Sequence, residues 1–85
     1  MINFAYPSLK NVVVLSDHLL ELEYDNNEKR IYDFKPNLNH SFFKELQNPA
    51  LFKNVFINNG ELEWPTGQDF CPHTLYEKSI LQHRT

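Results

Sequence analysis

An Asn-Gly pair, Asn59-Gly60, separates two short runs in which apolar and polar residues alternate. Both residue types accept the positive φ angles of a two-residue hairpin loop, so this arrangement is the strongest short-range sign of a β-hairpin. We therefore expect residues 53–58 and 61–64 to form antiparallel strands. The expected register pairs Ile57 with Leu62 and Val55 with Trp64. These pairs give the hairpin one apolar face, which other elements must cover.

A second hairpin is predicted around Asn26-Asn27, because residues 18–24 alternate in polarity and residues 28–34 can return beside them. A two-residue loop would place Glu23 opposite Arg30 and Leu22 opposite Ile31. One charge pair and one apolar pair then support this register, each worth roughly 0.2–1 kcal/mol. A further strand, rich in β-branched Val, is expected over residues 9–16.

Two helices are expected to pack on these strands. Residues 39–47 have apolar side chains at helical spacing, with Asn39 or Ser41 as the N-cap. A single helical turn at residues 51–52 follows, and the last helix is expected over residues 72–83. The side chains expected on the buried sides of the two helices are Phe42, Phe43, Leu46, Leu75, Tyr76, Ser79, Ile80 and His83.

The fold class follows from this order of elements. We expect an α+β domain, with a small antiparallel sheet of two hairpins plus an N-terminal strand, covered by two short helices. A chain of 85 residues is within the size of one domain, and no repeat or linker interrupts it. Residues 1–85 are therefore expected to form a single domain.

Charge and composition exclude several classes of partner. Eleven acidic residues against eight basic ones give a net charge of −3. Non-specific binding to nucleic acid or to an anionic membrane depends on basic residues, so neither is an expected partner. The longest apolar run, residues 12–15, is too short to span a bilayer, and no secretory signal is visible. The single cysteine, Cys71, permits no internal disulfide, so we expect a cytoplasmic protein.

The sequence contains no complete set of catalytic or metal-binding residues. Asp69, Cys71 and His73 alternate like a ligand ladder, but Pro72 marks a helix start, where such side chains diverge. Zinc sites also need a second pair of ligands. A helix N-terminus could lower the pKa of Cys71, yet a nucleophile and its base normally come from distant segments. We therefore expect no enzyme activity, no metal and no cofactor.

Two features are candidates for a functional surface. In the expected register Asp33 faces the core, where a carboxylate is costly unless it is paired or hydrogen-bonded. Asp33 is therefore a candidate polar site, or else a strand-end carboxylate that accepts backbone N–H groups from the next loop. Tyr32 and Phe56 point to the opposite face and are candidates for a partner surface. The alternative is that residues 1–7 fold over these two rings.

The C-terminal third contains a distinctive motif, Trp64-Pro65-Thr66-Gly67-Gln68-Asp69-Phe70-Cys71-Pro72-His73-Thr74-Leu75-Tyr76. It resembles the Trp-Pro-x-Gly-x-Asp-x-x-Pro-x-x-Leu-Tyr signature of a small bacterial family called domain of unknown function 2442. The resemblance extends from about Val12 onward. It includes residues 20–24 and 31–34 of the first hairpin and the spaced residues Leu46, Phe52 and Val55. Asn26-Asn27 replaces the family's usual Asp-Gly, and His73 stands where an acidic residue is common.

Each motif residue also has a structural explanation. Gly67 supplies a turn position with positive φ, and Pro72 fits the first turn of the last helix. Asp69 is expected to accept backbone N–H groups at the start of that helix. We expect the following motif residues to be structural: Trp64, Pro65, Gly67, Asp69, Pro72, Leu75 and Tyr76.

The resemblance implies an intracellular bacterial protein without assigned enzyme activity. Relatives are often found beside another small uncharacterised family, and the resemblance therefore implies toxin–antitoxin behaviour. The leading hypothesis is a non-catalytic protein-interaction module, the antitoxin-like half of a small bacterial protein pair. Its partner would be a neighbour-encoded protein or a second copy of the chain. The alternative is a small ligand-binding or enzymatic domain with a cleft around Asp33, Asp69, His73 and Tyr76.

Overall fold

The computed structural model of the chain describes residues 6–82. Its α-helices are α1 (Pro49–Phe52) and α2 (Pro72–Lys78), and its 3-10 helices are η1 (Ser16–His18), η2 (Lys35–Asn37) and η3 (Ser41–Gln47). The strands of this part of the chain are β1 (Leu9–Val14), β2 (Leu19–Tyr24), β3 (Lys29–Asp33), β4 (Phe56–Asn58), β5 (Glu61–Glu63), β6 (Asp69–Phe70) and β7 (Ile80–Leu81).

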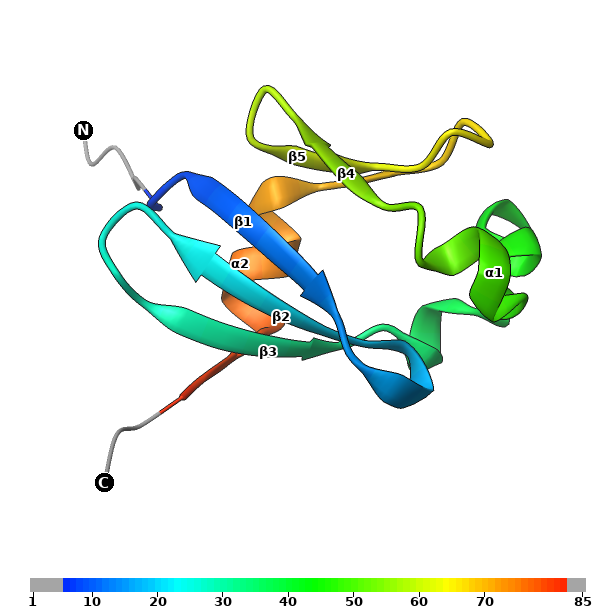
Figure 1. Cartoon of the computed structure of the whole chain (residues 1–85), viewed down its shortest axis with the longest axis horizontal. Helices are drawn as coiled ribbons and strands as arrows, with labels where there is room; N and C mark the ends of the chain where they lie inside the picture. The colour runs from blue at the N-terminus through cyan, green and yellow to red at the C-terminus, as the bar shows by residue number, and fades with distance from the viewer. Residues whose placement is uncertain (1–5, 83–85) are drawn as a thin grey trace.

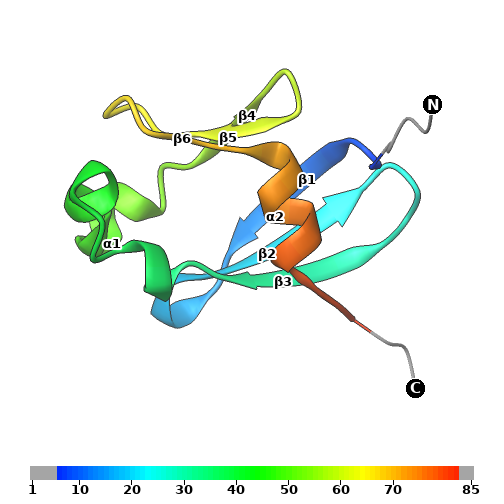
Figure 2. The ribbon, with the colours of Figure 1, turned by 180° about the vertical axis from the view of Figure 1, so that it is seen from behind.

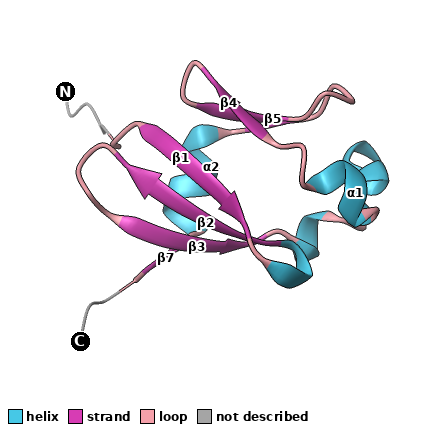
Figure 3. Cartoon of the chain, in the orientation of Figure 1, coloured by secondary structure: helices cyan, strands magenta, loops and turns pink. Residues whose placement is uncertain are grey.

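The strands form two antiparallel sheets with short helices, which confirms the predicted α+β class (Figure 1 and Figure 3). The larger sheet has the strand order β1-β2-β3-β7, and the smaller sheet has the order β4-β5-β6. Helix α2 lies across one face of the larger sheet (Figure 2). Each predicted hairpin therefore belongs to a different sheet. The smaller sheet gains the two-residue strand β6 from the motif, and the larger sheet gains the two-residue strand β7 from the residues after it.

The core is built mainly from aromatic and leucine side chains. Phe34 lies at its centre, with the rings of Phe52, Trp64 and Phe70 at centroid distances of 5.4, 5.3 and 5.4 Å. The alternation in β2 has the predicted effect, since its leucines at positions 20 and 22 and its tyrosine are buried. The largest fully buried side chains are Trp64, Tyr24, Phe34, Phe52, Leu20, Leu22, Leu46, Leu62 and Leu75.

The Asn59-Gly60 hairpin agrees with its predicted register. Ile57 pairs with Leu62, and the two loop residues have φ angles of 52° and 80°. The strands are shorter than expected, because β4 begins at Phe56 and β5 ends at Glu63. The loop chemistry therefore fixed the pairing, while the strand lengths depend on the rest of the fold.

The predicted register of the first hairpin is wrong by one residue. Leu22 pairs with Arg30, and its neighbours in β2 shift in the same way. The loop has three residues, because the N–H of Tyr24 donates to the carbonyl of Glu28 at 2.9 Å. Of the two asparagines expected to take positive φ, Asn27 alone does so, at 71°. A turn followed by one left-handed residue is a standard three-residue hairpin loop. Relative to the predicted register, the one-residue shift turns every β3 side chain to the other face of the sheet.

The segment before α1 is a 3-10 helix. Its N-cap is His40, without a side-chain cap bond, so the predicted caps Asn39 and Ser41 are wrong. With three residues per turn, Phe43 and Leu46 fall on one side and pack into the core. Phe42 falls outside that line and is 52% exposed, contrary to prediction. The expected turn at residues 51–52 is present as α1, with Phe52 buried.

Helix α2 is shorter than predicted. It ends at Lys78, and Ser79 is extended at φ −77° and ψ 160°. The chain then forms β7, so Ile80 is 69% exposed instead of lining a buried stripe, and His83 lies outside the described residues. Within residues 6–82, no helix combines the length and the apolar character needed to cross a bilayer.

Candidate functional site

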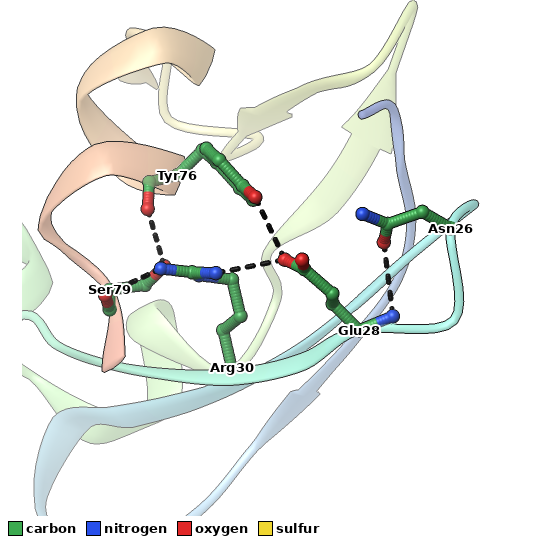
Figure 4. Close-up of polar contacts among 5 residues, drawn as sticks. All are labelled: Asn26, Glu28, Arg30, Tyr76 and Ser79. Atoms are coloured by element: carbon green, nitrogen blue, oxygen red, sulfur yellow. Dashed lines mark hydrogen bonds and ion pairs between the residues drawn. The ribbon is translucent and has the colours of Figure 1, made fainter. Parts of the chain in front are cut away.

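A polar cluster joins strand β3 to the end of helix α2 (Figure 4). Nε of Arg30 donates to Oγ of Ser79 at 2.6 Å, and one terminal guanidinium nitrogen donates to the carbonyl oxygen of Ser79 at 3.1 Å. The other terminal nitrogen donates to Oε1 of Glu28 at 2.8 Å. Every nitrogen of the guanidinium group therefore has an acceptor within the protein.

Tyr76 completes this cluster from the helix side. Its hydroxyl donates to Oε1 of Glu28 at 2.9 Å, and its ring centroid lies 4.2 Å from the guanidinium carbon of Arg30. Oγ of Ser79 donates to the carbonyl oxygen of Tyr76 at 2.8 Å. Asn26 in the hairpin loop fixes the backbone of Glu28, whose N–H it accepts at 3.0 Å. A cation–π contact and a closed set of hydrogen bonds hold these side chains in one arrangement.

The position of Arg30 in the sheet explains the cluster. Arg30 pairs with Leu22 and so lies on the face of β3 that packs toward the core. A cation there is tolerated only when its donors are satisfied. Each nitrogen of Arg30 already donates a hydrogen bond within the cluster, so the protein itself supplies acceptors for this cation. The chemical role that the geometry gives the cluster is to fasten α2 and β7 to the larger sheet.

The Tyr76–Glu28 contact changes the ionisation of both groups. The hydroxyl of Tyr76 is the main cause that lowers the pKa of Glu28 below its ordinary value of 4.5, and the bonds from Arg30 act in the same direction. The same hydrogen bond raises the pKa of Tyr76 above its ordinary value of 10.0. Both shifts keep Glu28 as a carboxylate that accepts a hydrogen bond from the neutral phenol of Tyr76.

We expect Tyr76→Phe to weaken the acid sensitivity of the domain. A carboxyl group whose pKa is lowered by folding stabilises the protein above its unfolded pKa, and this stability is lost as the pH falls through the folded pKa. The measurement is the urea midpoint of parent and variant between about pH 6 and pH 3. The difference in urea midpoint between parent and variant should narrow toward low pH. Tyr32→Phe is the control, because the hydroxyl of Tyr32 contacts the neutral amide of Asn37 at 2.7 Å. Its urea midpoint should differ from that of the parent by the same amount at every pH. A constant difference for Tyr76→Phe would contradict this assignment.

Tyr24 packs under this cluster on the same sheet face. Its ring meets the ring of Tyr76 edge-on at 5.0 Å, and the side chain is almost fully buried. Burial raises the pKa of Tyr24 to about 12, so its hydroxyl stays protonated at neutral pH. This buried hydroxyl has no hydrogen-bond partner within the described part of the chain.

Asp33 does not face the core, which corrects the prediction. The register shift pairs it with Leu19 and leaves it exposed. It accepts the backbone N–H of Lys35 at 3.0 Å, as the strand-end alternative predicted, and lies 3.1 Å from Nζ of Lys35. Partial burial raises its pKa, but the hydrogen bonds and charge of Lys35 outweigh this and leave the pKa below its ordinary value of 3.8. Asp33 is thus an ion-paired strand end.

The residues around the start of α2 do not converge on a metal. Asp69 lies in β6, exposed and paired with Glu63, and the N-cap of α2 is Cys71 without a side-chain cap bond. The prediction that Asp69 caps this helix is therefore wrong, because its strand ends before the helix begins. Cys71 is exposed, and the N–H and hydroxyl of Thr74 lower the pKa of its thiol. Within residues 6–82, no group of three or more His, Cys, Asp or Glu side chains could hold a metal ion.

The four residues of the alternative cleft do not all come together, although His73 and Tyr76 both lie on α2 and stack on Tyr6. Tyr76 reaches Glu28 just before the start of β3, whereas Asp33 is the last residue of that strand. Five residue steps along a strand separate these two ends by roughly 16 Å. His73 instead faces Tyr6, with ring centroids 5.5 Å apart, and lies 3.6 Å from Glu77. The structure therefore does not bring Asp33 and Tyr76 into one cleft.

The two candidate partner-surface residues differ in burial. Tyr32 is only 7% exposed, and its ring packs on Phe70 at 5.5 Å, so its prediction as an outward aromatic is wrong. The cause is again the register of the first hairpin, which pairs Tyr32 with Leu20 on the core side. Phe56 is 42% exposed and pairs with Glu63 on the outer side of the second hairpin. Phe56 alone keeps the predicted outward orientation.

Most motif residues contribute to the core, to a turn or to the start of a helix. Trp64 is buried, and its indole N–H donates to the carbonyl of Phe52 at 2.9 Å. Gly67 has a φ of 105°, and Pro72 is the first residue of α2. The buried Gln68 donates from its amide to Glu45 at 3.0 Å and accepts a hydrogen bond from Thr66. These contacts join the motif to η3 and α1.

Sequence reasoning missed Arg30, Ser79 and Glu28 as members of one cluster. The signal that could have found them is the three-residue alternative for the first loop, which puts Arg30 on the core side and requires acceptors for it. Nothing in the local sequence indicates that the helix ends just before Ser79. The cluster could therefore be predicted only in part.

Comparison with known proteins gives one family match. Residues 9–80 match the family described as "Protein of unknown function (DUF2442)". Neither the curated proteins nor the solved structures gave a significant match. The matched segment runs from the first residue of β1 to the first residue of β7, and it includes the strands and helices between them. The chain therefore belongs to the DUF2442 family.

Proposed function

We propose that this protein is a non-catalytic interaction module that works in the cytoplasm as the antitoxin-like half of a small bacterial protein pair. Its partner is a protein encoded beside it or a second copy. The observation that carries the proposal is a set of large apolar side chains left in solvent although the core is complete. These side chains are Val13, Leu15, Phe42, Phe56 and Ile80.

The position of these side chains supports a binding role. Val13 belongs to β1 and Phe56 to β4, and each of these strands is the edge of its sheet. Ile80 belongs to β7, the opposite edge of the larger sheet. Exposed apolar residues along sheet edges favour association with another chain. The polar cluster, by contrast, consists of side chains that already satisfy one another.

We expect Phe56→Ala to reduce association while leaving stability nearly unchanged. An exposed side chain contributes little to folding, so the free energy of unfolding should change by less than about 0.5 kcal/mol. An aromatic anchor in an interface contributes much more to binding, often more than about 2 kcal/mol. The measurement is co-expression with the adjacent genes, followed by co-purification and sedimentation of the complex.

Tyr32→Ala provides the matched comparison. Because Tyr32 is buried, this change should reduce stability strongly, whatever its effect on association. A parent protein that sediments as a monomer and retains no neighbour-encoded protein would contradict the proposed function. Unaltered association of Phe56→Ala would remove Phe56 from the interface.

A further inference from the structure

Among the elements of residues 6–82, no helix or strand packs on one face of the larger sheet. Helix α2 lies behind this sheet in Figure 1 and in front of it in Figure 2, so the face toward the viewer in Figure 1 is open. The covered face includes Leu22 and Tyr32, which are buried. We refer to the opposite side as the outer face, and we define it by the row of residues described next.

A single row of paired residues crosses all four strands on the outer face. Successive pairings join Val13 to Glu21, Glu21 to Ile31, and Ile31 to Ile80. Residues paired across antiparallel strands point to the same side, so these four side chains form one continuous row. Val13 is 43% exposed and Ile80 is the most exposed large apolar residue described. Beside Ile80 the surface is hollowed into a depression of about 460 Å³, lined in part by Ile31 and Pro36.

Glu21 is the one ionised group in this apolar row. No residue from Tyr6 to Gln82 forms an ion pair or hydrogen bond with its side chain. By contrast, the two carboxylates that flank the row on this face, Glu23 and Asp33, each have a lysine partner. Lys10 lies 3.9 Å from Glu23 at one end, and Lys35 lies 3.1 Å from Asp33 at the other. A molecule that covers the row must therefore compensate Glu21, because a carboxylate buried without a partner is strongly unfavourable.

We propose that the outer face is a docking surface of this module, separate from Phe56 on the smaller sheet, and that its occupant is a protein that places a lysine or arginine, flanked by aliphatic side chains, against Glu21. This inference rests on the proposed function and adds the chemistry of the partner. The net charge of −3 acts in the same direction, because it steers a basic partner toward the domain.

A second copy of the chain matches this surface less well. A two-fold contact brings a surface against itself, so the unpaired carboxylate of one copy would meet a row that has the same carboxylate. Two cations near the row, Lys10 and Lys29, both lie beside Glu23. A self-contact would therefore have to draw the cation for Glu21 from the surroundings of Glu23, whereas a basic partner supplies its own.

The test uses a displayed library of random peptides selected on the immobilised domain. We expect enriched peptides to share one lysine or arginine with aliphatic neighbours. A synthesised member should shift the backbone amide signals of Val13, Glu21, Ile31 and Ile80. Its affinity for Glu21→Lys should fall by at least roughly 30-fold, as for the loss of a desolvated charge pair. Replacing the peptide's cation by Glu should restore binding to Glu21→Lys.

Glu61→Lys is the matched control, because it changes the net charge equally on β5 of the smaller sheet. Binding lost equally in both variants would overturn the inference by showing a general charge effect. Peptides that bind only around Phe56, and not at the outer face, would overturn it while leaving the proposed function intact. A dimer of the parent chain, with shifted backbone amide signals at the outer face, would overturn the inference of a basic partner, because the occupant would then be a second copy of the chain. Absence of any enriched peptide would also overturn this inference, whereas the proposed function fails only if co-purification and sedimentation show no association.

Discussion

Replacing Phe34 by alanine should lower the free energy of unfolding by about 3–5 kcal/mol, the range for removing a core phenylalanine. Phe34 is completely buried, and it follows β3 at the point where both sheets and the α1 region meet. A domain of this size has a total stability on the order of 4–13 kcal/mol. The loss is therefore a large share of the total, and at the lower end of that range the variant is partly unfolded at room temperature.

The ring contacts of Phe34 give the physical reason for this large effect. Its centroid lies within 6.1 Å of five other rings, and no neighbouring side chain can close the space left by its removal without moving another element. The partners are Tyr32 at 6.1 Å, Phe43 at 5.2 Å, Phe52 at 5.4 Å, Trp64 at 5.3 Å and Phe70 at 5.4 Å. The cost then includes both the lost transfer free energy and the cavity that remains.

Phe42→Ala is the matched control for this measurement. It removes the same side chain from a position that is 52% exposed, so its effect should stay within about 0.5 kcal/mol. Urea denaturation followed by tryptophan fluorescence suits both variants, because Trp64 is buried beside Phe34. Equal losses for the two variants would contradict the placement of Phe34 at the centre of the core.

The contrast between the two hairpins shows how far sequence reasoning reaches. At Asn59-Gly60, the residue types allow one tight loop, and the register follows from it. At residues 25–27, two successive asparagines permit either a two-residue or a three-residue loop, and the apolar pattern fits both. The fold selects the longer loop, which places Tyr32 in the core. An error of one residue therefore exchanged the roles of Tyr32 and Asp33.

The candidate site was less predictable than the fold for a similar reason. Local sequence favours a helix through Ser79, since no proline or glycine stops it there. The helix ends because Arg30 binds the hydroxyl and carbonyl of Ser79, and the chain then pairs with β3 as β7. These contacts join residues 49 positions apart. Only the folded topology brings such residues together.

Replacing Arg30 by alanine should lower the free energy of unfolding by about 2–4 kcal/mol, more than most substitutions of a charged residue in a strand. The side chain of Arg30 is only 14% exposed. Its removal breaks the bonds to Glu28 and Ser79 and leaves a partly buried carboxylate without its cation. The ring of Tyr76 also loses the cation above it.

A matched control is available in the same strand. Lys29→Ala removes the neighbouring cation from an exposed position, so its effect should stay within about 0.5 kcal/mol. Urea denaturation gives the stability of both variants, and hydrogen exchange at β7 reports whether this strand has detached. Rapid exchange of the β7 amides in Arg30→Ala, but not in Lys29→Ala, would show that the cluster fastens the C-terminal strand.

A double-mutant cycle then separates the free energy that comes from the Arg30–Glu28 contact from the free energy lost through packing alone. If Arg30 and Glu28 act as a unit, the cost of Arg30→Ala combined with Glu28→Gln should be less than the sum of the single costs. The difference should be about 0.5–3 kcal/mol, because the second change removes a carboxylate that has already lost its partner. Additive costs would show that Arg30 stabilises the domain only through its hydrocarbon stem and through Ser79. Arg30→Met, which retains a long apolar chain but not the bonds to Ser79, should then be more stable than Arg30→Ala and less stable than the parent.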